Sequence, residues 1–411
     1  MRETDTLRNE SAAMISVEAA VVGGGPAGLT AAIALAQAGI ETALLAPPYK
    51  GDNRTTALLS GSVAALTALG VWDNCRDEAA PLEAIRLIDD RGGLLRAPEL
   101  LFHAEEIGLP AFGYNVENRR LVEALSARAG ELPQLQWFAQ PALALDTGDD
   151  AVTLRLADGR AVRARLVVGA DGRNSFCRQA AGIGAESGRY PQTALTANLT
   201  HTRPHHHIST EFHTRSGPFT LVPLRGSQSS LVWVADVRDG ARLSRLGADD
   251  FARAVEAQAH SMLGRFQVGS EREAFPLSWQ TAHRLAANRV ALVGEAAHVV
   301  PPIGAQGFNL GLRDAATIAE VAAKARHAGG DIGSTETLAE YDDRRRMDVR
   351  SRTLAIDLLN RSLLTDFLPL RGLRGIGLEL LHRIGPLRRA LMREGVAPML
   401  SEPRLMRGEA F

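Results

Sequence analysis

The chain has few cysteines, and that scarcity limits its chemistry. Only Cys75 and Cys177 occur among 411 residues. Two thiols cannot build a disulfide framework or a cysteine-ligated metal cluster, and this usage is typical of a reducing compartment. No CxxC or CxxxxC pair occurs, which argues against a flavin–disulfide reductase. We expect both cysteines to be ordinary small residues.

The chain also lacks an excess of charge of either sign. It carries 46 Lys and Arg against 47 Asp and Glu, a balance of −1, so nucleic acid is not an expected partner. Residues 1–14 are polar, with three acids, and match neither a signal peptide nor a transit peptide. We predict a disordered lead-in there. With 411 residues, two domains or one interrupted domain are expected.

What the chain does have is glycine, in three informative segments. The first follows Ala19–Val22, a short apolar strand, and precedes Leu29–Ala38, an expected helix. Between them, Gly23 permits a tight turn, Gly25 lets the backbone approach a pyrophosphate, and Gly28 lets the helix pack closely on the strand. The N–H groups at the helix start then face the phosphates. This segment predicts a dinucleotide site.

This region has an uncharged stretch and lacks the acid that often follows the second strand. Residues 19–40 carry no charge, so length alone permits a membrane span, but three glycines and Pro26 argue against one. The next strand is expected at Thr42–Leu45. An acid that contacts the adenosine ribose often follows this strand, whereas Ala46 stands here.

The second and third segments repeat the pattern of a strand that ends at glycine. Leu166–Val168 leads to Asp171 and Gly172, and Val290–Val293 leads to Gly294 and Glu295. Ligand contacts lie at the carboxyl ends of strands in such folds. Next comes a proline- and glycine-rich loop before a helix, whose N–H groups and dipole suit the pyrimidine side of a flavin. Its candidate contacts are Gly304, Gln306, Gly307 and Asn309.

The remaining elements complete an α/β plan. The expected pieces are a loop at 52–61 leading into a helix, paired strands at 82–89 and 93–96, helices at 118–129, 308–324 and 337–360, and a hairpin of 151–156 and 161–168 around Asp158-Gly159. Residues 185–280 alternate apolar and polar, as an antiparallel sheet does. The predicted FAD-binding domain comprises 15–80, 107–182 and 283–350, the substrate domain 81–106 and 183–282, and a C-terminal helical segment 351–411.

Together these segments resemble the single-component flavin-dependent aromatic hydroxylases of the para-hydroxybenzoate hydroxylase fold, and most closely their ubiquinone-biosynthesis branch. The resemblance spans roughly 17–348. Further motifs that carry it are Asp52-Asn53-Arg54, Glu117-Asn118-Arg119, Gly217-Pro218, Pro223-Leu224, and Tyr341 with Arg344, Arg345 and Asp348.

The resemblance implies FAD across the glycine loop, with Arg54 and Arg119 near the flavin and phosphates and Asp171 at the second motif. Glu295 takes the place of an acid that contacts the ribityl chain, usually Asp, or Asn in some ubiquinone hydroxylases. NAD(P)H reduces the flavin, O2 gives a C4a-hydroperoxyflavin, and an electron-rich ring takes the distal oxygen. The candidate catalytic residues are His298, for which a packing role is the alternative, and Pro302.

Two runs of like residues have simpler alternatives. His205-His206-His207, with His201 and His213 nearby, suggests a metal site, but neighbours on a strand point to opposite faces, so we expect a solvated strand end or loop and no metal. Arg344-Arg345-Arg346 is expected to be a solvated helix face rather than an anion site.

The C-terminal segment is basic and amphipathic. Seven arginines lie in 361–393 against Asp366 and Glu379, interleaved with leucines. Such a stretch fits either peripheral contact with an anionic membrane, as a prenylated substrate would need, or packing on the FAD domain or in a homodimer. We expect a cytoplasmic protein, with the inner membrane as a possible surface. The alternative functions are a hydroxylase of a small soluble aromatic acid and a non-catalytic flavin-binding scaffold in a biosynthetic complex.

Overall fold

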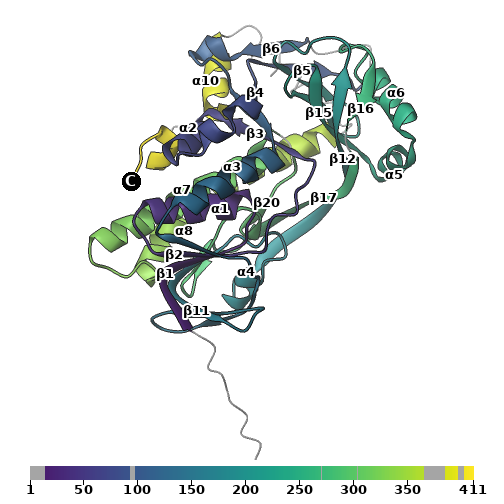
Figure 1. Cartoon of the computed structure of the whole chain (residues 1–411). Coiled ribbons are helices and arrows are strands. Elements are labelled where there is room, and N and C mark those ends of the chain that lie inside the picture. The colour runs from purple at the N-terminus through teal and green to yellow at the C-terminus, as the bar shows by residue number, and fades with distance from the viewer. Residues whose placement is uncertain (1–13, 93–97, 270, 303, 365–384, 397–401) are drawn as a thin grey trace, which may run out of the picture.

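Two large sheets and one small one organise the molecule (Figure 1). The computed structural model describes residues 14–92, 98–269, 271–302, 304–364, 385–396 and 402–411. The predicted α/β class, with a Rossmann-like FAD-binding part and an inserted sheet, is confirmed.

Five parallel strands form the centre of the first sheet, in the order β19-β11-β1-β2-β8. Their side chains are largely buried because helices cover such sheets. The predicted hairpin is confirmed, since β10 runs antiparallel to β11. The strands of this sheet are β1 Met14–Val22, β2 Thr42–Leu45, β8 Leu135–Phe138, β9 Ala142–Thr147, β10 Val152–Leu156, β11 Ala161–Gly169, β18 Ala286–Ala287 and β19 Val290–Leu292.

Helix α1 accounts for the uncharged residues 19–40, whose length alone would permit a membrane span. Every residue from Gly28 to Ala36 is buried, and a helix that is apolar all round belongs in a protein core. It packs against α3 and α7, with α8 alongside (Figure 1). No helix within the described ranges is long and apolar enough to span a bilayer. The helices of this part are α1 Pro26–Gln37, α2 Ser60–Ala68, α3 Asn118–Glu131, α4 Phe176–Ala180, α7 Gln306–His327 and α8 Thr335–Leu364.

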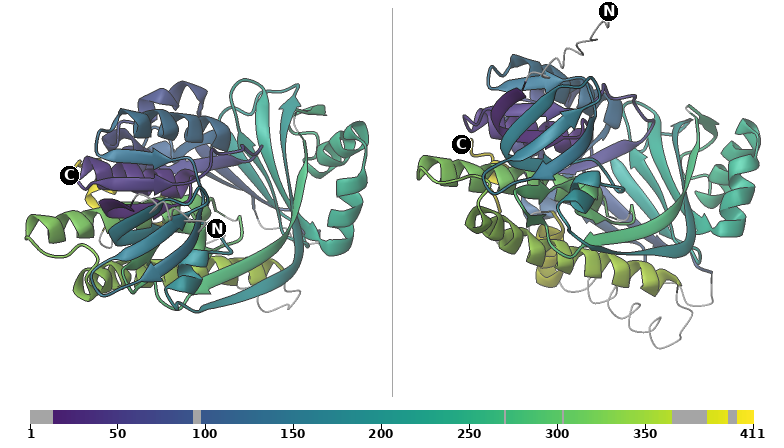
Figure 2. Two further views of the ribbon diagram at one scale, coloured as in Figure 1. Left: turned by 60° about the horizontal axis from the view of Figure 1, so that its bottom comes forward. Right: turned by 90° about the horizontal axis from the view of Figure 1, so that it is seen from below.

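The second sheet has nine strands and is mixed rather than purely antiparallel, because β13 pairs with β5 in parallel. β5 pairs with β6, whereas the partner predicted at 93–96 lies outside the described residues. The long β12 and β17 pair with each other in this sheet and reach from it toward the first sheet (Figure 2). The strands are β5 Ala84–Asp89, β6 Leu100–His103, β12 Ala185–His201, β13 Ile208–His213, β14 Pro218–Pro223, β15 Gln228–Asp236, β16 Phe266–Val268, β17 Glu273–Ala282 and β20 His298–Val299.

Sequence alternation missed several elements. Two helices interrupt the inserted sheet, and a strand replaces half of the loop expected at 52–61. The helix α5 begins at a side-chain cap, with Asp236 accepting from two backbone N–H groups, but buries only Gly240 and Leu243, too few apolar residues for a visible helical period. The missed elements are α5 Val237–Arg245, α6 Ala248–Gln258 and the three-stranded sheet of β3 Thr55–Leu59, β4 Ala80–Pro81 and β7 Gly113–Glu117.

The histidine run is a turn before β13, and its expected solvation is wrong for His205. That side chain is 7% exposed, with Nε2 2.9 Å from the Leu224 carbonyl oxygen. His201 is buried too, and its ring nitrogens lie 2.7 Å from Arg203 O and 3.0 Å from Ser229 Oγ. Within the described ranges, no three His, Cys, Asp or Glu side chains are placed to hold a metal ion. Each ring is therefore a structural part of the sheet end.

These histidines predict acid sensitivity between pH 7 and 5. Burial lowers the pKa of both His201 and His205, against the opposing effect of their carbonyl partners. The unfolded chain therefore binds protons first as pH falls, and stability is lost from about pH 6.5 downward. We expect the fall in melting temperature over this range to be smaller in His205→Gln than in the wild type, because glutamine takes up no proton. An unchanged slope would contradict this assignment.

The C-terminal tail is packed on the protein at two places. Helix α10, Gly385–Val396, lies beside β6, where the Arg388 guanidinium pairs with Glu106 and covers the Phe102 ring at 4.5 Å. The turn η5, Arg404–Arg407, buries Leu405 and Met406 against α2. The predicted packing partner is therefore wrong for α10, which packs on residues assigned to the substrate domain, whereas η5, beyond 393, packs on the FAD-binding part. Residues 365–384 lie outside the described ranges.

Candidate functional site

The three glycine segments meet at one sheet edge. Val22 at the end of β1 is in register with Gly169 of β11, which is in register with Leu292 of β19. The contact continues past the strand ends, where Ala170 N donates to Val22 O at 2.8 Å. Segments 23–28, 170–175 and 293–295 therefore lie side by side at the carboxyl edge, where this fold binds ligands.

The first loop has the geometry of a pyrophosphate cradle. Gly23 adopts a φ of +119°, and a side chain there would strike the Ala170 carbonyl. A Cβ on Gly28 would lie 2.0 Å from Gly23 O, so helix and turn are in close contact. A Cβ on Gly25 would meet no protein atom within 4 Å. Two glycines thus serve the fold and the third keeps open space before the start of α1, as FAD requires.

Ala46 lies directly beneath this loop. It is fully buried, and a Cβ built on Gly24 would lie 2.8 Å from its methyl group. Trp137 Nε1 donates to the Ala46 carbonyl oxygen at 3.0 Å. The residue therefore supports the loop by packing, and its side chain offers no hydrogen bond to a ribose.

Asp171 uses its carboxylate within its own loop. Oδ1 accepts from Ser175 Oγ at 2.5 Å and Oδ2 accepts from Cys177 N at 3.0 Å, which fastens the segment to the start of α4. Gly172 makes the turn between them with a φ of +80°. In this structure Asp171 shapes the second segment, and its predicted contact with FAD remains a prediction.

Glu295 and Arg54 bring opposite charges to the site. Glu295 is exposed between buried Gly294 and Ala296, so its side chain leaves the strand end toward open space. Burial alone would lower the pKa of the Arg54 guanidinium, but its hydrogen bond with Asp52 at 2.8 Å and the charges of Asp52 and Glu295 raise it. The predicted pair therefore shares one electrostatic environment.

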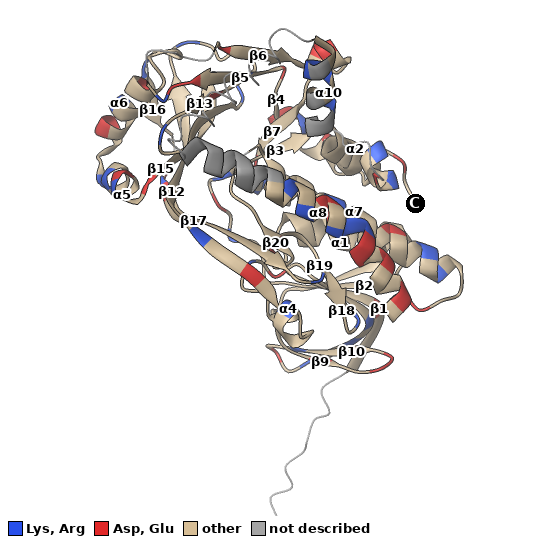
Figure 3. Ribbon diagram, turned by 180° about the vertical axis from the view of Figure 1, so that it is seen from behind, with Lys and Arg blue, Asp and Glu red and all other residues tan. Residues whose placement is uncertain are grey.

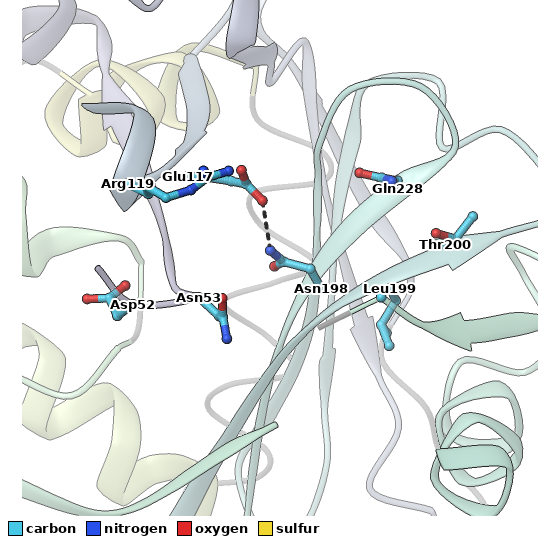
Figure 4. Close-up of a pocket in the computed structure, with 9 residues that line it drawn as sticks. Asp52, Asn53, Glu117, Arg119, Asn198, Leu199, Thr200 and Gln228 are labelled. Carbon is cyan, nitrogen blue, oxygen red and sulfur yellow. Dashed lines mark hydrogen bonds between the residues drawn. The ribbon is translucent and has the colours of Figure 1, made fainter. Parts of the chain in front are cut away.

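Arg119 lines a polar pocket between the end of β7 in the small sheet and the strands β12 and β15 of the second large sheet (Figure 4). The pocket has a volume of about 300 Å³ and is also lined by Asp52 and Asn53. Glu117 Oε1 accepts from Asn198 Nδ2 at 3.1 Å, a bond that crosses from β7 to β12. Asp52 thus bonds Arg54 and lines the same pocket as Arg119, and the contacts of both arginines with the flavin and phosphates stay a prediction.

The loop before α7 is held by two amide side chains that sequence reasoning gave to the cofactor. Asn309 Nδ2 donates to Ala57 O and Ala305 O, and its Oδ1 accepts from Leu59 N and Ser62 Oγ. All four hydrogen-bonding positions of that amide are thus occupied. Contact of the Asn309 side chain with FAD is therefore not supported.

Gln306 is likewise turned toward protein. Its Nε2 donates to Gly304 O at 3.1 Å, and its Oε1 accepts from Arg352 Nη1 at 3.0 Å. What the loop offers a flavin is therefore backbone, chiefly the N–H groups near Gly307 at the helix start. Pro302 is exposed in the same loop.

His298 is buried in an ionic cluster. Its Nε2 lies 2.6 Å from Asp314 Oδ2, and both side chains are at most 1% exposed. Asp314 also accepts from Gly294 N at 3.0 Å and from Arg345 Nε at 2.8 Å. Burial would raise the pKa of Asp314, but the His298 and Arg345 charges hold it below its usual value. Such an inaccessible imidazole suits positioning of the strand end better than contact with a substrate.

The solvated face predicted for the arginine run is wrong for Arg345. Its side chain is 4% exposed between Asp314 and Asp348. Arg344 pairs with Glu320, and Arg346, which is 40% exposed, pairs with buried Asp342 and exposed Asp343. Asp314 was missed altogether. A signal for both existed, because Asp314 interrupts a helix face that is otherwise buried and apolar, and a buried acid requires a cation.

Comparisons with known proteins agree with this geometry. Residues 16–353 match the family described as FAD binding domain. The ubiquinone hydroxylase UbiL of Rhodospirillum rubrum is 38% identical, with 94% of this chain and 92% of that protein covered. The 3-demethoxyubiquinol 3-hydroxylase of Escherichia coli is 31% identical, with 92% and 97% covered.

A solved structure supports the fold. The p-nitrophenol 4-monooxygenase PnpA of Pseudomonas putida superposes with a TM-score of 0.76 at 21% identity, over 93% of this chain and 98% of that one. The glycine cradle, the shared sheet edge and the full-length sequence matches are consistent with one another. The chain therefore belongs to the FAD-dependent monooxygenases, in the branch that includes the ubiquinone hydroxylases.

Proposed function

We propose that the enzyme hydroxylates the ring of a polyprenylated phenol, a precursor of ubiquinone. The observation that carries the proposal is the match, over nearly the whole chain, to proteins named ubiquinone hydroxylase and 3-demethoxyubiquinol 3-hydroxylase. The reaction consumes O2 and NAD(P)H, the co-substrates typical of this class. One oxygen atom enters the ring as hydroxyl and the other leaves as water, while NAD(P)H gives up a hydride.

FAD, when bound, would supply the redox chemistry, and we assign these residues to hold it. Gly23 and Gly28 shape the cradle, Gly25 leaves room for the pyrophosphate, and the N–H groups at the start of α7 would stabilise charge on the flavin ring. Glu295 would contact the ribityl chain, and Arg54 lies in the same electrostatic environment.

Substrate class is tested by giving the purified, FAD-loaded enzyme two substrates under the same conditions. We expect turnover of a prenylated phenol presented in detergent micelles, and little turnover of para-hydroxybenzoate. Preference for the small acid would replace the proposal with the alternative of a soluble aromatic hydroxylase. Absence of turnover on both, with FAD bound, would favour a non-catalytic flavin-binding scaffold.

The same question can be asked in cells. A strain without this protein should accumulate a prenylated precursor that lacks one ring hydroxyl, and the wild-type gene should restore ubiquinone. A normal quinone profile in that strain would contradict the proposal.

We propose further that the enzyme contacts membranes peripherally through the outer face of α10. The inner face is occupied by Arg388 and Met392 against the second sheet, while Arg389 and Arg393 are exposed one helical turn apart. Cations near an anionic surface each add roughly 1 kcal/mol of attraction. This face therefore suits an enzyme whose substrate lies in the bilayer.

Deletion after about residue 360 would be a poor test, because it also removes the buried Leu405 and Met406. A double Arg389→Gln, Arg393→Gln variant is better. We expect it to lose most of its binding to vesicles containing phosphatidylglycerol. The matched control is Arg238→Gln with Arg242→Gln, an exposed pair at the same spacing on α5. Equal binding by both variants would refute membrane contact through α10.

A further inference from the structure

The loop that precedes α7 contains two consecutive left-handed residues. Gly304 has a φ of +65°, and Ala305 a φ of +55°. For a residue with a side chain this conformation costs about 1–2 kcal/mol, so it persists only where its surroundings enforce it. The left-handed conformation of Ala305 therefore needs specific contacts at the start of α7.

Two side chains hold the strained turn. Asn309 Nδ2 donates to Ala305 O from within α7, and Gln306 Nε2 donates to Gly304 O. Asn309 is anchored to β3 and α2 by its other bonds. Gln306 has one anchor outside the loop, the guanidinium of Arg352 on α8 at 3.0 Å.

Arg352 belongs to an ion chain that runs through the core. Its Nε donates to Asp348 at 2.8 Å, Asp348 pairs with Arg345, and Arg345 pairs with Asp314. Asp314 in turn accepts from Gly294 N at the end of the third segment. This series of ion pairs therefore connects two backbone segments of the predicted flavin site, the strand end at Gly294 and the helix start at Gln306.

The cluster balances its charges. Apart from His298 beside Asp314, its acids are Asp314, Asp348 and Glu402, and its arginines are Arg313, Arg345 and Arg352, three of each sign. Glu402 connects the C-terminal tail to the cluster, since its Oε1 lies 3.2 Å from Arg313 Nη2. Because the members lie on α7, α8 and the tail, their spacing is fixed by helix packing (Figure 3). A cluster held in this way can fix the position of the loop before α7.

We propose that Arg352 is a positioning residue that, through Gln306, holds the Gly304–Ala305 turn in the shape that receives the flavin ring. The inference concerns FAD binding and does not depend on the identity of the substrate. Without the guanidinium, Gln306 loses its external anchor and the turn relaxes away from its left-handed conformation. The flavin then meets misplaced N–H groups.

The test measures FAD binding to the apoprotein by flavin fluorescence. We expect Arg352→Met to raise the Kd at least about tenfold, the effect of one hydrogen bond with a charged donor. The apoprotein should stay folded, because Asp348 keeps Arg345 and Arg313 as partners. The matched control is Arg346→Met on the same helix, whose partners are local acids. It should bind FAD within about twofold of wild type.

A double-mutant cycle separates positioning from general loss of structure. Gln306→Leu should weaken FAD binding like Arg352→Met, and the double variant should be no worse than either, because both remove the same link. Wild-type affinity in Arg352→Met would overturn the proposal, as would additive effects in the cycle. If Arg352→Met does not fold, the proposal still requires that Gln306→Leu folds and binds FAD more weakly than the wild type.

Discussion

Replacing Gly25 with valine is expected to give a folded protein that retains no FAD. A side chain at Gly25 meets no protein atom within 4 Å, and its φ of −73° and ψ of 175° suit valine. The new methyl groups instead fill the space in front of α1 that the pyrophosphate must enter. The measurement is the visible flavin spectrum of the purified protein, together with its melting temperature.

Two other glycines make this prediction specific. Gly28→Val should fail to fold, because its Cβ would lie 2.0 Å from the Gly23 carbonyl oxygen. Gly130→Val, at an exposed position in α3 with no atom within 4 Å, should fold and keep its FAD. A normal flavin spectrum in Gly25→Val would show that the first segment does not bind the pyrophosphate.

Arg345→Met is expected to cost about 3–5 kcal/mol of unfolding free energy, the usual penalty for removing one partner of a buried ion pair. The substitution leaves Asp314 fully buried with only His298 and the Gly294 N–H as partners, and it takes a guanidinium from Asp348. Urea denaturation of the apoprotein measures the loss without interference from FAD binding.

Arg253→Met is the control for Arg345→Met. Arg253 pairs with Asp250 within α6, and the two side chains are 69% and 58% exposed, so the loss of this guanidinium should change the unfolding free energy by at most about 1 kcal/mol. A similar loss in the two variants would mean that the buried cluster is no more important than a surface pair. The claim that the buried ion pairs of Arg345 contribute strongly to the unfolding free energy would then be wrong.

The parallel core and the meeting of the glycine segments were predictable because their signals are local. Ala19–Val22, the glycines after it and the apolar helix that follows each specify a strand, a turn and a helix within a few residues of one another. Parallel strands then bring their carboxyl ends to one edge, so separate local motifs become one site.

The tasks of the polar side chains were less predictable, because they depend on partners far along the chain. Asn309 and Gln306 stand in a cofactor motif, yet their amides bind residues of β3, α2 and α8. The strand β3 was missed because it pairs only with β7, about sixty residues later in the sequence. Sequence identifies the loop that faces FAD, and the tertiary contacts decide which atoms remain free to do so.

The most direct test of the central claim is the origin of the new oxygen atom. Purified enzyme with FAD, a prenylated phenol and NADH or NADPH, whichever it oxidises faster, would be supplied with isotopically labelled O2, and the product analysed by mass spectrometry. We predict one labelled oxygen atom on the ring for each nicotinamide cofactor oxidised in coupled turnover. A hydroxyl carrying oxygen from water, or cofactor oxidation with no hydroxylated product, would contradict assignment as a ring hydroxylase.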